Sequence, residues 1–210
     1  MDGETFVAEL ETTTATQLKR LGSDKLLVAL TDATLEEGRV LAAAAASEYA
    51  AAETFHAWAS DEADAGARAA FEDVAAQEDE HAERVTAHLD AFEPPTAPGP
   101  MHAYLRGRED TVERVATGLV ARPLVSARAH TQVVSFFINE ADRERTDLFR
   151  ELKTDTEAVV ETGKALLEAR CRDEEDWDRA AATAAYLIQV AYDDYVDALA
   201  GMGLDPRSIC

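Results

Sequence analysis

The sequence predicts a single all-helical domain, and three observations support this prediction. Apolar residues recur at steps of three and four along most of the chain, which is the period of an amphipathic α-helix. No segment shows the strict alternation of a half-buried strand. The 210 residues, of which 47% are hydrophobic, can enclose one sizeable core, so we expect residues 1–210 to form one domain.

Turn and cap residues delimit the predicted helices. Thr34 and Glu37 have the spacing of a capping box at the head of a long helix. Four prolines between residues 93 and 100 mark the clearest break, Pro123 is placed to open a helix, and Asp142 is placed to cap one. The expected elements are an N-terminal helical extension (1–33), a first helical hairpin (34–92), a Pro-rich crossover with its own helix (93–122), a second hairpin (123–171) and a C-terminal helix (174–201).

The charge balance excludes several partners. With 42 acidic against 20 basic residues the net charge is −22, so nucleic acid and anionic membranes would be repelled. No apolar run is long enough to span a membrane and no signal-type segment opens the chain, so we expect a cytoplasmic protein. Only four of the basic residues are lysines, a bias that resembles proteins of extreme halophiles; the alternative is an ordinary acidic protein. Cys171 and Cys210 lack C-x-x-C spacing and are expected to be free thiols.

Two carboxylates and one imidazole lie on the predicted apolar stripes of the first hairpin. Glu48 falls on the inward face of the first helix, and Glu78 and His81 fall together on that of the second. Glu48 precedes the turn at residue 62 by 14 residues and Glu78 follows it by 16, so both lie roughly 21 to 24 Å from the turn. A bound metal ion would satisfy all three groups in an apolar core. The alternative is that they pair with arginines, or with water at a helix end.

The motif residues of this hairpin resemble the first hairpin of the rubrerythrins. The likeness lies in Glu48, Phe55, Trp58, Phe71 and the run from Glu78 to Arg84, and it covers residues 48–89. That family has a ferritin-like bundle with a di-iron site and reduces peroxide with electrons from a rubredoxin-like domain. The resemblance implies a ferritin-like fold of two hairpins joined by a long crossover. It also implies Glu48, Glu78 and His81 as ligands of iron, with manganese or zinc as the other candidates.

The second hairpin departs from the family pattern. A shift of 78 residues aligns the two interhelical turns and places Ser126, Thr156 and Val159 where the first hairpin has Glu48, Glu78 and His81. None of these three is a strong iron ligand, so the sequence predicts half of a dinuclear site. His130, one turn after Ser126, is the candidate fourth ligand; the alternative is a packed core histidine. A further candidate set is Glu140, Glu168 and Cys171.

Two function classes follow from these residues. The first is a rubrerythrin-like metal-binding protein, an oxidoreductase acting on peroxide or oxygen or a protein that handles iron, with one or two ions. Because no electron donor is built into the chain, turnover would need an electron-donor protein. The second is a ferritin-like scaffold without metal that has a structural or interaction role. In both classes we expect a homodimer.

Overall fold

The chain is entirely helical over the residues that the structure describes. This computed structural model describes residues 1–206, which contain helices and connecting segments but no strand, as the sequence predicted. Cys210 lies outside these residues. In chain order the elements are α1 (Gly3–Thr13), α2 (Ala15–Leu21), α3 (Lys25–Leu30), α4 (Glu37–Asp61), α5 (Ala65–Thr86), α6 (Pro100–Arg106), α7 (Thr111–Arg114), the π-helical segment η1 (Val115–Ala121), α8 (Arg122–Asn139), α9 (Arg143–Arg170) and α10 (Glu174–Gly201).

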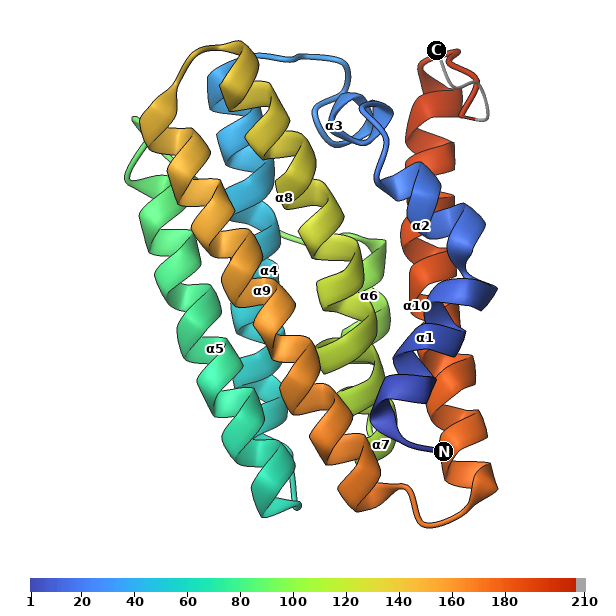
Figure 1. Cartoon of the computed structure of the whole chain (residues 1–210). Helices are drawn as coiled ribbons and strands as arrows, with labels where there is room; N and C mark the ends of the chain where they lie inside the picture. Colours follow the sequence, from blue (N-terminus) through green and yellow to red (C-terminus); the bar gives the residue numbers. More distant parts are fainter. Residues whose placement is uncertain (207–210) are drawn as a thin grey trace.

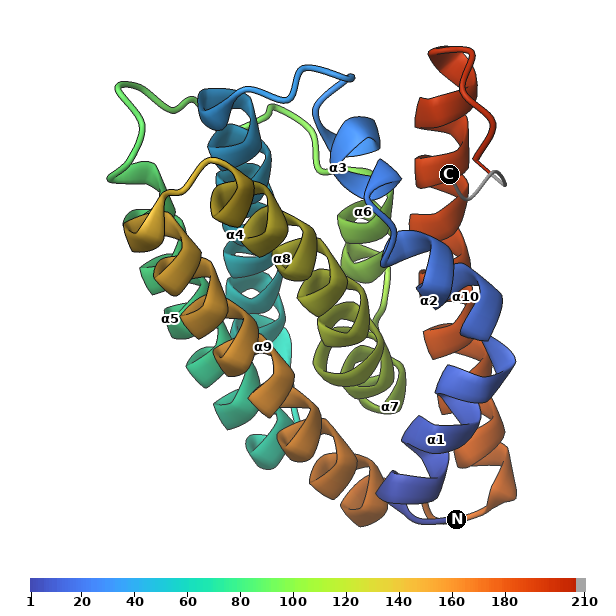
Figure 2. The ribbon, with the colours of Figure 1, turned by 45° about the horizontal axis from the view of Figure 1, so that its top comes forward.

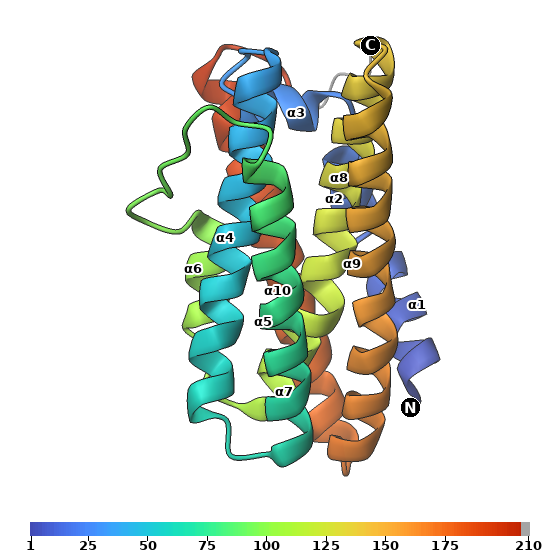
Figure 3. The same cartoon turned by 90° about the vertical axis from the view of Figure 1, so that its left-hand side faces the viewer.

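Four long helices form a bundle that consists of two hairpins. Helix α4 packs along α5, and α8 packs along α9, each pair joined by a turn of a few residues (Figure 1). The crossover leaves α5 at one end of the bundle and returns through α6 and α7 to the other end. Helices α5 and α8 therefore run in the same direction (Figure 3). A bundle of two hairpins with one long crossover is thus observed.

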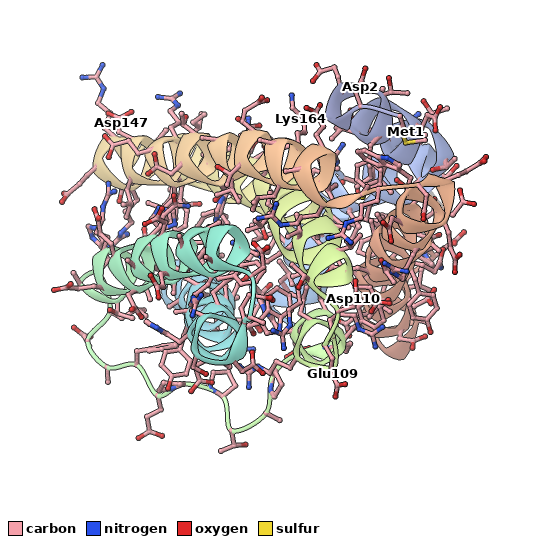
Figure 4. The ribbon with its side chains drawn as sticks, turned by 90° about the horizontal axis from the view of Figure 1, so that it is seen from below. Met1, Asp2, Glu109, Asp110, Asp147 and Lys164 are labelled. Carbon is pink, nitrogen blue, oxygen red and sulfur yellow. The ribbon has the colours of Figure 1, made fainter. Side chains whose placement is uncertain are left out.

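The remaining helices cover one side of this bundle. Helices α1 and α2 pack on α10, and these three lie against α8, η1 and α9 (Figure 2). Seen from the end of the bundle, the start of α1 at Asp2 lies close to Lys164 of α9 (Figure 4), and Lys164 forms an ion pair with Glu4. The short helix α3 contacts α8 and α10. The N-terminal extension and the C-terminal helix together bury the outer face of α8.

Aspartate side chains cap the starts of most of the longer helices. A carboxylate at this position accepts backbone N–H groups that have no partner in the helix, and its charge is favoured by the helix dipole. The cap at Asp142 confirms the sequence prediction. The helices with such a cap are α1, α5, α7, α9 and α10, capped by Asp2, Asp64, Asp110, Asp142 and Asp173.

The predicted capping box at the head of α4 does not form. Glu36 is the residue that precedes the helix, and no side chain caps it. Asp32 and Ala33 both have positive φ angles, 50° and 60°, so the chain turns sharply before α4. Helix α4 then begins at Glu37 itself, which puts Glu37 in the first helical position rather than the third that a capping box requires.

The helix expected to open at Pro123 begins earlier. Helical backbone is continuous from Thr111 through η1 into α8, and Pro123 lies near the start of α8. Proline lacks an N–H donor and its ring crowds the preceding turn, and a π-helical stretch directly before it changes the pattern of hydrogen bonds there.

Helix α5 ends at Thr86, before the expected residue 92.

Candidate metal centre

Glu48, Glu78 and His81 meet in the interior of the bundle. Each offers one ligand atom such that all three atoms lie within 4.8 Å of one another. Their residues are 2%, 0% and 1% exposed. The sequence placed these side chains at one height on facing helices, and the structure brings them together there. The result is a buried acidic and imidazole cluster of a kind that can hold a metal ion.

The cluster belongs to a polar layer that divides the apolar core. On α4, Glu48 lies between Ala45, in one apolar cluster, and Phe55, in the other; on α8, His130 lies between Val133 and Val125 in the same way. Helices α5 and α9 also contribute buried polar residues at this level. All four bundle helices therefore supply polar groups to one cross-section. The buried polar residues of the layer are Glu48, Glu78, His81, Arg122, Ser126, His130 and Thr156.

His130 is bound to Glu48 rather than placed as a free fourth ligand. Its Nε2 lies 2.8 Å from Glu48 Oε1, and its residue is 3% exposed. The ring packs near Phe149 at 6.2 Å between centroids. His130 thus orients the Glu48 carboxylate, and its own Nδ1 has no hydrogen-bond partner. It is neither a lone packed histidine nor, in this geometry, a member of the ligand cluster.

Arg122 forms an ion pair with Glu78 inside the layer. The guanidinium donates from Nη2 to Glu78 Oε1, and the two side chains are 1% and 0% exposed. The same guanidinium lies over the Phe55 ring, 5.3 Å from its centroid. Its Nε and Nη1 atoms have no partner. Sequence reasoning missed Arg122 because it assigned this residue to the end of the crossover, outside the bundle.

Asp155 of α9 is the second residue that sequence reasoning missed. Its Oδ2 lies 3.4 Å from His81 Nε2, while His81 Nδ1 has no partner. The Asp155 side chain is 47% exposed, so it reaches the layer from the surface. A histidine that binds a metal through one nitrogen commonly donates its other N–H to a carboxylate. Asp155 is suited to that supporting role.

The helix of the crossover brings another buried histidine within the electrostatic influence of Arg122 and Glu48. His102, in α6, is 5% exposed and neither ring nitrogen has a partner. Burial, assisted by the charge of Arg122, lowers the pKa of His102 to about 3, so the ring is neutral near pH 7. No spacing in the sequence connects His102 with the first hairpin.

The pKa values of the two carboxyl groups in the layer, those of Glu48 and Glu78, are shifted in opposite directions. Burial acts to raise the pKa of Glu48, but the charge and hydrogen bond of His130 outweigh it, and the pKa lies below its usual value. Burial is the main cause that raises the pKa of Glu78; together with the Glu48 carboxylate it outweighs the opposing charge of Arg122, so this pKa lies well above its usual value. Of the two groups, Glu78 is therefore the one that takes up a proton more readily, and Arg122 is the group that favours its charged form.

The other candidate ligands lie outside the layer. Glu140 is an exposed residue of the turn between α8 and α9. Glu168 is also exposed and accepts a hydrogen bond from the backbone of Gly3, at the end of the bundle. Among residues 1–206 the cluster of potential ligands therefore has members only from the first hairpin.

Comparisons with known proteins give no relative: no family model, no curated protein and no solved structure matches the chain. Over the described residues, no helix is both long enough and apolar enough to cross a membrane.

The residues of the layer fit a single transition-metal ion. Carboxylate and imidazole donors suit iron, manganese and zinc. Two ligands of a tetrahedral ion lie about 3.4 Å apart for bonds of about 2.1 Å, so small rotations of the glutamate side chains would close the present spacing. Glu78 Oε2 and His81 Nδ1 are buried without partners. These two atoms of α5 make no other bonds and could both serve as metal ligands.

Proposed function

We propose that this protein is a ferritin-like, rubrerythrin-like metalloprotein that binds one transition-metal ion through Glu48, Glu78 and His81. The observation that carries the proposal is the convergence of these three buried groups within 4.8 Å. The single long crossover, with α5 parallel to α8, agrees with a ferritin-like connectivity. Iron is the ion we favour, and manganese and zinc have the same ligand preferences in this site.

Arg122 takes the place of a second cation in this proposal. A dinuclear site needs carboxylates from both hairpins to neutralise two ions, and the second hairpin contributes Ser126 and Thr156 instead. The guanidinium of Arg122 already pairs with Glu78 from the side of α8. One divalent ion and one guanidinium beside two carboxylates leave a net charge of +1, whereas two divalent ions would leave +2 before counting Arg122. The layer therefore favours one ion.

The chemistry proposed for the site is the activation of oxygen or peroxide. A bound iron or manganese would supply electron transfer and Lewis acidity to an oxygen ligand. Around it, His130 holds Glu48 in place and Asp155 steadies His81. Arg122 has two nitrogen atoms without partners, Nε and Nη1, whose N–H groups can donate to an anionic oxygen atom. Glu78, whose pKa is raised by burial, can hold a proton at its carboxyl group until an ion binds. Continuous turnover would require an electron-donor protein.

Metal content tests this proposal. We expect about one ion per chain by elemental analysis, lost when Glu78 and His81 are both changed to alanine. The matched control changes Glu83 and His88, the same residue types near the end of α5; Glu83 is exposed and His88 only partly buried. This control should keep its metal. Equal metal content in both variants would show that the ions bind elsewhere.

One observation favours a second candidate, a scaffold that binds no metal. Glu78 and Glu48 each have a partner from α8, namely Arg122 and His130. Buried charge pairs of this kind can have a purely structural role, in which they fix how the helices are arranged. Absence of metal in wild-type protein, both as purified and after incubation with iron(II), manganese(II) or zinc(II), would select the scaffold.

A further inference from the structure

An apolar pocket leads from the surface to the polar layer. It is bounded by α3, α4, α8 and α10 and encloses about 120 Å³. Most of its lining is aliphatic, including Leu26, Leu27, Val40, Val125, Ala129 and Val133. At its inner end lie Glu48, Ser126 and His130. A small apolar cavity with a few convergent polar groups has the make-up of a ligand site.

The pocket has an entrance. Its mouth shares Leu30, Ala43, Ser47, Met101 and Asp194 with a wider outer hollow of about 400 Å³. The Pro-rich stretch 95–100 forms part of the wall of that hollow. In Figure 3 the segment that contains these prolines stands away from the bundle beside α4. A molecule can therefore pass from solvent along this segment into the pocket and reach Glu48.

The inner end of the pocket has unmet hydrogen-bonding groups. Ser126 Oγ is buried and has no partner, although a hydroxyl can both donate and accept. His130 gives its Nε2–H to Glu48, and its Nδ1, also buried, has no partner. That second nitrogen accepts a hydrogen bond when the ring is neutral and donates one when the ring is charged, and a hydroxyl can do either. A ligand hydroxyl can therefore bond to His130 Nδ1 in either form of the ring, and also to Ser126 Oγ.

The charges around the pocket disfavour an ionic ligand. A carboxylate would meet Asp194 at the mouth and Glu48 at the inner end. An ammonium would find no unpaired anion inside, because Glu48 already has His130 and Glu78 already has Arg122. Burial of an unpaired charge costs far more than burial of a hydroxyl that finds partners. The pocket therefore favours a neutral molecule.

We propose that this pocket binds a short, neutral aliphatic molecule with one terminal hydroxyl group, its hydroxyl held by Ser126 and His130 and its chain among the aliphatic side chains. The size sets the chain length, since a cavity of about 150 Å³ holds benzene and this one would hold about five or six carbons. The inference goes beyond the proposed function, because it concerns a second ligand, next to Glu48. It is tested in metal-free protein, so it can fail or hold independently of the metal site.

The first test is a series of straight-chain primary alcohols from propanol to octanol. Binding to the metal-free protein is followed by saturation-transfer NMR and calorimetry. Affinity should rise about fourfold per methylene and stop rising at about five or six carbons. Pentanoate and pentylammonium should bind at least about tenfold more weakly than 1-pentanol. No detectable binding of 1-pentanol, or binding of either ion with equal affinity, would overturn the proposal.

Variants then locate the site. Ala129→Leu adds bulk to the pocket wall and should abolish binding of 1-pentanol, while Ala57→Leu, an exposed position of α4, should leave it unchanged. Ser126→Ala should weaken 1-pentanol about three- to tenfold but leave 1-chlorobutane, which has no hydroxyl, unaffected. Helicity and thermal unfolding confirm that each variant folds. Unchanged binding in Ala129→Leu, or equal loss of both probes in Ser126→Ala, would contradict the proposed pose.

Discussion

The guanidinium of Arg122 and the carboxyl group of Glu78 form an ion pair within the bundle, with side chains 1% and 0% exposed. Helix α8 thereby places a permanent positive charge beside Glu78 of α5. Without this charge, the buried carboxylate would need a metal ion or a proton to neutralise it. Such a pair is costly to break by removing one partner, whereas replacing both partners by neutral groups of similar size is often tolerated.

A double-mutant cycle on this pair is the first prediction. Arg122→Met should lower the free energy of unfolding of the metal-free protein by about 3 kcal/mol at pH 8, because it leaves Glu78 without its cation. Arg122→Met combined with Glu78→Gln should recover most of that loss. Chemical denaturation of the wild type, both single variants and the double variant gives the coupling energy. Additive effects would show that the two groups do not interact.

The pH dependence of the Arg122→Met variant has a definite sign. Burial, with the charge of Glu48, raises the folded-state pKa of Glu78, and removal of Arg122 raises it further. A carboxyl group with a raised folded pKa stabilises the fold below its unfolded pKa, and this contribution is lost as pH rises through the folded value. The variant should therefore be less impaired at pH 5 than at pH 8. The same denaturation curves at both pH values check this.

Proton release on metal binding is the second prediction. Burial and the Glu48 carboxylate raise the pKa of Glu78, and burial lowers the pKa of His81, so a proton held at this site sits on Glu78 rather than on His81. Binding of an ion should displace that proton, with a release of up to about one proton per ion, and the apparent affinity should rise with pH. Calorimetry in buffers of different ionisation enthalpy measures the number of protons. In Glu78→Gln, whose side chain carries no such proton, the release should disappear; a similar release would assign it elsewhere.

The contrast between the two hairpins shows how much of the site the sequence could predict. Glu48, Glu78 and His81 lie on the apolar stripes of two regular α-helices. Counting residues from the turn between these helices was therefore enough to predict that the three side chains meet. The 78-residue shift also placed Ser126 and Thr156 correctly in the buried layer.

Arg122 and His102 could not be found in that way. Arg122 directly follows η1, and a π turn contains more residues than an α turn, so α-helical periodicity does not carry across it. The expectation of a helix start at Pro123 also assigned Arg122 to the crossover. His102 comes from α6, whose position depends on tertiary packing and not on any repeat. The fold class and the first hairpin were therefore predictable, but Arg122, which sets the charge of the site, and His102 were not.

Close packing of α9 against η1 is the basis of the third prediction. A Cβ atom on Gly163 would lie 2.8 Å from the Leu119 carbonyl oxygen and 2.8 Å from Val120 Cγ2. Gly163→Ala should destabilise the fold by about 1 to 3 kcal/mol, despite the higher helix propensity of alanine. The control Gly38→Ala, in the first turn of α4 with nothing within 4 Å of the added atom, should be neutral or stabilising. Thermal unfolding of both variants checks this, and equal effects would argue against the contact.

The acidic composition leads to the fourth prediction, a dependence of stability on salt. With a net charge of −22, repulsion between carboxylates opposes the compact state and is screened as salt rises, since the Debye length falls from about 30 Å at 0.01 M to about 3 Å at 1 M. Screening also weakens exposed ion pairs such as Arg39 with Asp32, but each of these contributes little. The thermal midpoint should therefore rise with potassium chloride. Sucrose, which does not screen charge, serves as the control at matched osmolality: an equal rise in sucrose would attribute the effect to solute exclusion rather than to charge.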